Sequence, residues 1–287
     1  MLRNSRRFAG RVLVAALCAL AWTASTSQAQ NTPAPAPQQG QPGAGAAPGA
    51  RPAGGGMGDR FAGQPRIRAL MVAGGCCHDY PTQGGALMKL LQAELPVDWD
   101  FKYLGGTAGS FIPKLYDDPN WYKGYDVVVH NECFTPADSL ISEQYLQNAA
   151  AATKAGIPAL VIHCAMHTFR AEPGDLWRGI LGVRTVRHER AANIPIKVAA
   201  AQHPIMAGFK PDWVTPTDEL YVIERTLPGT MPLATGTAPD GKEYPVAWTH
   251  NNGARVFGTT LGHGVDTWND PVFQKMMVQG FRWAVGK

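Results

Sequence analysis

The chain has 287 residues, with 26 lysines and arginines against 22 aspartates and glutamates, a formal net charge of +4. Four of the arginines fall within the first 11 residues, which contain no acid, so the rest of the chain carries equal numbers of both charges. A balanced charge without a basic stripe argues against nucleic-acid binding. No stretch after residue 29 is long and apolar enough to span a bilayer, so we expect no stable membrane insertion of the processed chain.

The first 29 residues have the pattern of a signal peptide. Arginines precede an apolar run from Val12 to Trp22 that is too short to cross a membrane, and Ser27-Gln28-Ala29 is a small-residue cleavage site. We therefore expect an exported protein, periplasmic or secreted. The sequence Ser5-Arg6-Arg7-Phe8 leaves twin-arginine export open beside the general secretory route.

Residues 30–64 are rich in Pro, Gly, Ala and Gln and contain almost no large apolar side chain. Such a composition cannot offset the entropy lost on ordering, so this segment is predicted to be a disordered linker. Residues 65–287 are long enough to form one domain with a substantial core.

Strand-like and helix-like segments alternate in the first half of that domain, which predicts an α/β fold with a doubly wound, mainly parallel, flavodoxin-like sheet. The expected elements are a strand at Ile67–Val72, a helix at Gly84–Leu95, strands at Trp99–Leu104 and Tyr125–His130, a helix at Ser142–Ala155 and a strand at Pro158–His163. The second half has shorter pieces, which predict a small β extension at Ile194–Ala199, Leu220–Ile223, Val246–Thr249 and Arg255–Thr260.

The last segment predicts a buried strand, a Gly-His-Gly loop and a helix. The strand runs to Leu261, and the loop carries His263. Asn269 or Asp270 can cap the helix, and Pro271 suits its first position. Because ligands bind beyond the carboxyl ends of strands in open α/β sheets, His263 is a candidate site residue.

Several short motifs resemble the ThuA-like family, which is named for trehalose utilisation and shares the class I glutamine amidotransferase-like fold. They are PVAWTH, RVFGTTLGH, Trp-Asn-Asp-Pro and WAVGK near the end of the chain, with HPIMAG from His203 and DELY from Asp218 upstream. The resemblance covers residues 66–287 and implies the fold and a role in carbohydrate metabolism. It also implies a functional role for the histidine-containing turn at His78, while His188 is a looser match.

Histidines follow several of the predicted strands and are expected to meet at one edge of the sheet. They are His78, His130, His163, His167 and His263, with Glu132 beside them. Two chemistries fit this cluster. Imidazoles and carboxylates can exchange protons with a polar substrate near neutral pH, or His78, His163 and His263 can hold a divalent metal such as zinc.

In the acid-base interpretation, His163 or His263 is the catalytic base and Glu219 its acid partner, with His78 as an orienter or metal ligand. Glu219 and Tyr221 alternate along a predicted strand, so both face the pocket if that side is the inner one. If it is the outer one, they are an exposed edge. The residues expected to bind substrate are His78, Asp79, His130, Glu132, Cys164 and Tyr221.

A third option is a cysteine nucleophile at Cys164, where the related amidotransferases carry theirs. Ile162 and Met166 argue against it, because a nucleophile elbow needs small neighbours. The alternative is a small cysteine that lines the pocket. For the other cysteines, a bond from Cys76 or Cys77 to Cys133, a vicinal disulfide and free thiols are all compatible with the sequence.

The function that best fits these features is the processing of a keto sugar or glycoside by an isomerase, lyase or hydrolase. A carbonyl acidifies the adjacent carbon-bound proton, which suits histidine and carboxylate chemistry. A non-catalytic sugar-binding module is the alternative, and the sequence leaves the oligomeric state open.

Overall fold

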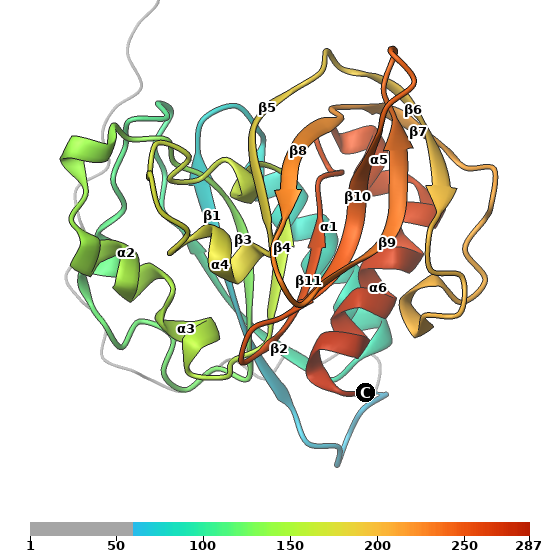
Figure 1. Ribbon diagram of the computed structural model, residues 1–287. Coiled ribbons are helices and arrows are strands. Elements are labelled where there is room, and N and C mark those ends of the chain that lie inside the picture. The colour runs from blue at the N-terminus through green and yellow to red at the C-terminus, as the bar shows by residue number, and fades with distance from the viewer. Residues whose placement is uncertain (1–59) are drawn as a thin grey trace, which may run out of the picture. The chain divides into compact units, whose positions relative to one another are not determined.

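The computed structural model describes residues 60–287 (Figure 1). The predicted signal peptide and the linker up to residue 59 lie outside the described residues. Residues 60–64 form turns, and Arg60 donates a hydrogen bond to the carbonyl of Ala93 at 2.5 Å. Within residues 60–287, no helix is both long enough and apolar enough to cross a membrane.

The centre of the domain is a nine-stranded sheet with the order β2-β1-β3-β4-β11-β10-β9-β6-β7. Its first five strands are parallel and reproduce the expected flavodoxin-like order, so the predicted fold class is confirmed. Their bounds are β1 (Ile67–Gly75), β2 (Val97–Tyr103), β3 (Val127–Cys133), β4 (Ala159–Ile162) and β11 (Arg255–Thr259).

The sheet continues from β11 with antiparallel strands, and a separate two-stranded sheet joins β5 to β8. The bounds are β10 (Glu243–Asn251), β9 (Thr230–Thr237), β6 (Ala192–Val198) and β7 (Val214–Asp218), with β5 (Val183–His188) and β8 (Tyr221–Thr226) in the small sheet. Strands β5, β7 and β9 were not expected from the sequence. Proline in β7 and both proline and glycine in β9 lower the local strand propensity, so pairing with distant strands decides these elements.

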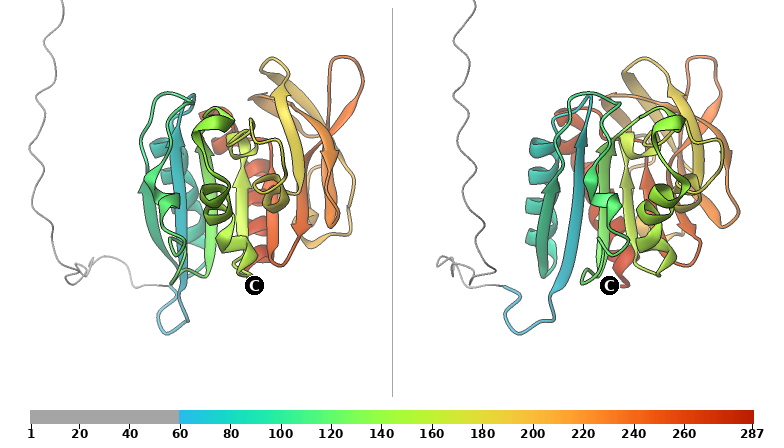
Figure 2. Two further views of the ribbon diagram at one scale, coloured as in Figure 1. Left: turned by 60° about the vertical axis from the view of Figure 1, so that its left-hand side comes forward. Right: turned by 90° about the vertical axis from the view of Figure 1, so that its left-hand side faces the viewer.

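Helices cover both faces of the parallel strands (Figure 2). One face packs against α1 (Tyr80–Glu94) and α6 (Pro271–Val285), with the short α5 (Val265–Asn269) beside them. The other face packs against α2 (Glu143–Ala149), α3 (Ala151–Lys154) and α4 (Arg178–Leu181). Short 3-10 turns lie at Lys114–Asp117, Asp138–Leu140, His163–Met166 and Pro204–Met206.

Helix α6 matches its prediction closely. The carboxylate of Asp270 accepts hydrogen bonds from the backbone N–H groups of Val272 and Phe273, and Pro271 occupies the first position. The face that packs on the sheet consists of Phe273, Met276, Met277, Gly280, Phe281 and Ala284. The helical period of apolar residues therefore reports the buried face correctly.

Two glycines provide a test of this packing. A Cβ on Gly280 in α6 would lie 2.3 Å from Cδ1 of Phe257, whereas a Cβ on Gly85 in α1 would meet no heavy atom within 4 Å. We expect Gly280→Ala to lower the free energy of unfolding by about 1–3 kcal/mol, because overpacking outweighs the better helix propensity of alanine. Gly85→Ala should raise it by up to about 1 kcal/mol. Urea unfolding followed by circular dichroism measures both, and equal stabilities would contradict close packing of α6 on β11.

Candidate functional site

A cavity of about 290 Å³ lies at the carboxyl ends of the parallel strands, beside the small β5–β8 sheet. The loop after β1, the end of β3, the turn after β4 and the loop after β11 all contribute to it. The residues that line it are Cys76, Cys77, His78, Cys133, Thr135, Cys164, His167, Arg170, His188, Glu219, Tyr221 and His263. This position agrees with the rule that ligands bind at the strand ends of open α/β sheets.

His163 is buried at the turn that follows β4. Its backbone has a φ of +48°, a left-handed conformation that costs free energy for a residue other than glycine. Its Nδ1 lies 2.6 Å from the carbonyl oxygen of Thr260, which can only accept, so Nδ1 carries a proton and donates a hydrogen bond to this oxygen. Nε2 is buried without a hydrogen-bond partner and lies 3.5 Å from Oε2 of Glu219.

His78 and His263 complete a group of three imidazoles with His163. The ring centroid of His78 lies 4.7 Å from that of His163 and 5.1 Å from that of His263, and both contacts are edge-on. Each ring offers a nitrogen, and these three nitrogens lie within 4.8 Å of one another. Burial, together with the two neighbouring histidines, lowers the pKa of His78 to about 3, so its imidazole is neutral near pH 7.

Glu219 supplies a carboxylate to this group from the junction between β7 and β8. Its Oε2 lies 3.4 Å from Nδ1 of His263, and its Oε1 lies 3.6 Å from Nδ1 of His188. Burial alone raises the pKa of Glu219, but the imidazoles of His163, His263 and His188 outweigh burial and lower that pKa below its ordinary value. Glu219 is therefore ionised at neutral pH.

Asp218, the residue before Glu219, fixes the positions of both Glu219 and His263. Its carboxylate is fully buried and accepts hydrogen bonds from the backbone N–H groups of Glu219 at 2.8 Å, Gly262 at 2.9 Å and His263 at 3.3 Å, and from the hydroxyl of Thr267 at 2.7 Å. Asp218 was not among the site residues expected from the sequence. The only signal for it was its place in the DELY motif.

Aromatic rings form another wall of the cavity. His167 stacks on Tyr221, with ring centroids 4.2 Å apart and an interplanar angle of 12°. His188 also stacks on Tyr221, at 5.4 Å, because these two residues are partners in the β5–β8 pairing. The structure thus brings together Tyr221, His167 and Glu219. It adds His188, which the family resemblance matched only loosely, and Arg170, which was not expected from the sequence.

The four cysteines of residues 60–287 are paired. Cys76 is bonded to its neighbour Cys77, and Cys133 is bonded to Cys164. Of the alternatives that the sequence left open, the vicinal disulfide is present. Because Cys164 is in a disulfide and the left-handed residue of its turn is His163, this structure offers no thiol nucleophile at Cys164.

His130 and Glu132 lie outside the cavity, on a covered face of the sheet. Strand β3 continues to Cys133, three residues beyond its predicted end, so these two side chains point to a face of the sheet and not to its edge. Both are fully buried, and Oε1 of Glu132 lies 2.9 Å from Nδ1 of His130 and accepts a hydrogen bond from the hydroxyl of Tyr116 at 2.8 Å.

Asp79 is also outside the cavity. It is the N-cap of α1, where its exposed carboxylate accepts hydrogen bonds from the backbone N–H of Thr82 at 3.1 Å and from the Thr82 hydroxyl at 2.7 Å. Its place before the first helical turn explains these bonds, since a cap satisfies N–H groups that have no partner within the helix.

Comparison with known proteins identifies relatives of the fold. The family model described as ThuA, trehalose utilisation, matches residues 76–284. A putative ThuA-like protein from Parabacteroides merdae is 20% identical, with a TM-score of 0.62 over 78% of this chain and 91% of that chain. Another from Bacteroides uniformis is 17% identical, with a TM-score of 0.59 over 81% and 96%. None of the curated proteins compared with the chain matches it.

The buried histidine on the cavity wall makes stability depend on pH. Burial, and then the positive charge of Arg170, lower the pKa of His167 to about 3, whereas an unfolded histidine has its ordinary value of about 6.5. Below that value only the unfolded chain takes up the proton, so stability is present at pH 7 and is lost as the pH falls. At pH 5, this difference in the pKa of His167 should lower the free energy of unfolding by about 2 kcal/mol.

Substitution of His167 by phenylalanine isolates this contribution. His167→Phe keeps an aromatic ring against Tyr221 and removes the titrating group. We expect the variant to lose about 2 kcal/mol less stability than the wild type between pH 7 and pH 5, measured by urea unfolding at both values. Identical losses in the two proteins would show that His167 is not held neutral in the folded state.

Proposed function

The chain belongs to the ThuA family, and on this premise we propose that it is an enzyme that moves protons on a carbohydrate bearing a carbonyl group, such as a keto sugar or keto glycoside. The observation that carries the proposal is the approach of His163 and His263 to the ionised carboxylate of Glu219, with His78 against both rings, beside one cavity that His78, His263 and Glu219 line. Buried nitrogens without hydrogen-bond partners at this point support a binding site, because such groups are costly in a purely structural core.

The three imidazoles are suited to hold a divalent cation such as zinc. Three histidine nitrogens with an open position are a ligand set of catalytic zinc sites, and the hydrogen bond from His163 Nδ1 to the Thr260 carbonyl fixes the tautomer that a ligand needs. A cation there would polarise a carbonyl or hydroxyl oxygen of the substrate. Glu219 lies beside the three rings as a further ligand or as a base.

Glu219 is the group that we assign to proton transfer. A carbonyl acidifies the proton on the adjacent carbon, and a carboxylate at the edge of the cavity can accept it. The side chain of Glu219 is 15% exposed, so a ligand in the cavity can reach it. The side chain of His188, which is 38% exposed, lies between Oε1 of Glu219 and the solvent. The geometry thus favours Glu219 as the base, and the histidines as the groups that bind a cation and polarise the substrate. From the sequence, a histidine was expected to be the base and Glu219 its acid partner.

The cavity also supports a small polar substrate. Its volume of about 290 Å³ is just below the range of roughly 300–1,000 Å³ for small-molecule sites, which favours a small ligand such as a single sugar ring. Its lining includes an aromatic stack and an arginine in addition to the histidines. These groups offer stacking and hydrogen bonds to a sugar, and the family description points to carbohydrate metabolism.

Proton transfer can be followed directly by isotope exchange. We expect the purified protein, incubated in D₂O with keto derivatives of glucosides, to introduce deuterium next to the carbonyl or to convert the sugar, as read by NMR. Glu219→Gln should lower this rate by roughly 10²- to 10⁴-fold, the contribution of a general base. Glu224→Gln, at an exposed position on β8, is the matched control and should retain the wild-type rate.

Measurements of metal content and sugar binding distinguish metal-assisted catalysis, metal-free acid-base catalysis and non-catalytic sugar binding. We expect about one zinc-like ion per chain, removed by a chelator together with the activity and absent from His163→Ala. Full activity without metal would leave acid-base chemistry by Glu219 and the histidines alone. If the protein binds sugars saturably but catalyses no deuterium exchange in any keto sugar, it is a non-catalytic sugar-binding module and the proposed enzyme activity is wrong.

We also propose that the protein is exported. The signal-peptide pattern of residues 1–29 supports this, and so do two disulfides, which persist in oxidising compartments. The expected result is a processed chain in the periplasmic or secreted fraction that begins near Gln30, as determined by N-terminal sequencing. Recovery of the full-length chain from the cytoplasm would contradict export.

A further inference from the structure

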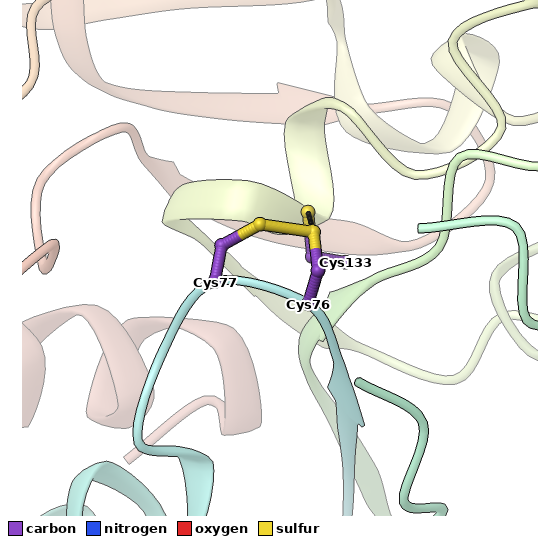
Figure 3. Close-up of side chains that lie close together, drawn as sticks. All are labelled: Cys76, Cys77 and Cys133. Carbon is purple, nitrogen blue, oxygen red and sulfur yellow. Dashed lines mark hydrogen bonds between the residues drawn. A yellow bond between two sulfur atoms is a disulfide. The ribbon is translucent and has the colours of Figure 1, made fainter. Parts of the chain in front are cut away.

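The four cysteines of residues 60–287 lie in a row along one wall of the cavity. Cys77 is bonded to Cys76, Sγ of Cys76 lies 3.8 Å from Sγ of Cys133, and Cys133 is bonded to Cys164. Figure 3 shows the vicinal pair in the loop after β1, with the sulfur of Cys133 next to that of Cys76. The row runs from Cys77, which is exposed, to Cys164, which is 7% exposed.

A purely structural role does not account for the vicinal disulfide. A structural disulfide stabilises a protein mainly because it closes a loop in the unfolded chain, and the effect grows with loop length. The bond between Cys76 and Cys77 joins adjacent residues and closes almost no loop. It also lies at an exposed turn in which Cys77 has a φ of +86°, a strained conformation for a residue other than glycine.

We propose that these cysteines form a redox-active site, in which an external thiol reduces the row at Cys77 and the electrons pass to the Cys133–Cys164 disulfide. Cys77 is the point of entry because attack on a disulfide requires access, and Cys77 is the exposed residue of the row. The thiol can belong to a small molecule or to a cysteine of another protein. This inference does not depend on the proposed reaction on sugars.

Each step is a thiol–disulfide exchange. An external thiolate attacks Sγ of Cys77 and forms a mixed disulfide, and the Cys76 thiolate leaves. The Cys76 thiolate attacks the neighbouring Sγ of Cys133, and Cys164 leaves as a thiolate that takes a proton from solvent. A second external thiolate then releases Cys77 from the mixed disulfide.

The electrons balance over these steps. Two external thiols become one disulfide, and the protein gains two electrons and two protons. It then contains a Cys76–Cys133 disulfide and free thiols at Cys77 and Cys164. Because Cys77 precedes His78 and Cys164 follows His163 in the sequence, both ends of the row adjoin the histidine group, so the exchange changes the wall of the cavity.

The test is a map of the disulfides after partial reduction. The purified processed protein is treated with reduced glutathione, or separately with one equivalent of dithiothreitol, then alkylated and analysed by peptide mass spectrometry. After two electrons per chain we expect a Cys76–Cys133 disulfide with alkylated Cys77 and Cys164. If only dithiothreitol is effective, the natural reductant is a dithiol, such as a protein with paired cysteines.

Two variants form a matched pair for the transfer between the disulfides. Cys77→Ser leaves Cys76 with a free thiol beside Cys133, so we expect it to form the Cys76–Cys133 bond and free Cys164 without any reductant. Cys76→Ser leaves the free thiol on Cys77 and should keep Cys133–Cys164 intact, with reduction by glutathione at least about tenfold slower than in the wild type. Thermal unfolding of each variant shows whether the fold is retained. If a variant does not fold, the disulfide map of the partly reduced wild type tests the proposal by itself.

Either of two results would overturn the proposal. One is alkylation of all four cysteines in the untreated protein. The other is a two-electron product in which Cys76 and Cys77 are both alkylated while Cys133–Cys164 remains bonded, because this would show that the two disulfides do not exchange.

Discussion

The buried carboxylate of Asp218 is the interaction on which the candidate site depends. It lies at the end of β7, the outermost strand of the antiparallel half, and it accepts hydrogen bonds from the loop that follows β11 in the parallel half. The same carboxylate holds the backbone N–H of Glu219. Asp218 therefore joins two parts of the sheet and places Glu219 opposite His263. A buried carboxylate with several donors is costly to disturb, which makes it a rigid support.

Strain and unpaired polar atoms occur together at the histidine group. The turn after β4 has the left-handed residue that a nucleophile elbow would have, but this residue is His163, and the adjacent cysteine is bonded to Cys133. An imidazole whose Nδ1 is held by the Thr260 carbonyl thus occupies the strained position of this turn, one residue before Cys164. Strained backbone and buried unsatisfied nitrogens are unfavourable for stability, and their coincidence with a cavity supports the proposal that this group is a functional site.

The features that the sequence predicted correctly are local or follow from strand order. The apolar runs identified the central parallel strands, and the cap at Asp270 with the helical period after it located α6 and its buried face. His78, His163 and His263 were placed at one edge because parallel strands share the edge at which their carboxyl ends lie. The same reasoning placed His130 at this edge incorrectly. A strand end that is predicted from propensity is uncertain by a few residues, and because β3 continues three residues beyond its predicted end, His130 lies on a face of the sheet.

The sequence by itself determined the family resemblance, because its motifs are local. It also determined the parallel strands and the meeting of three histidines, because apolar runs identify such strands and their carboxyl ends share one edge of the sheet. Only the tertiary structure decided which carboxylates support them. Asp218 and His188 depend on strands β5, β7 and β8, whose partners are distant in the chain. The Cys133–Cys164 bond depends on the pairing of β3 with β4, which brings the ends of these strands together. Such pairings come from the packing of the whole domain, because the local propensity of short strands is too weak to specify them.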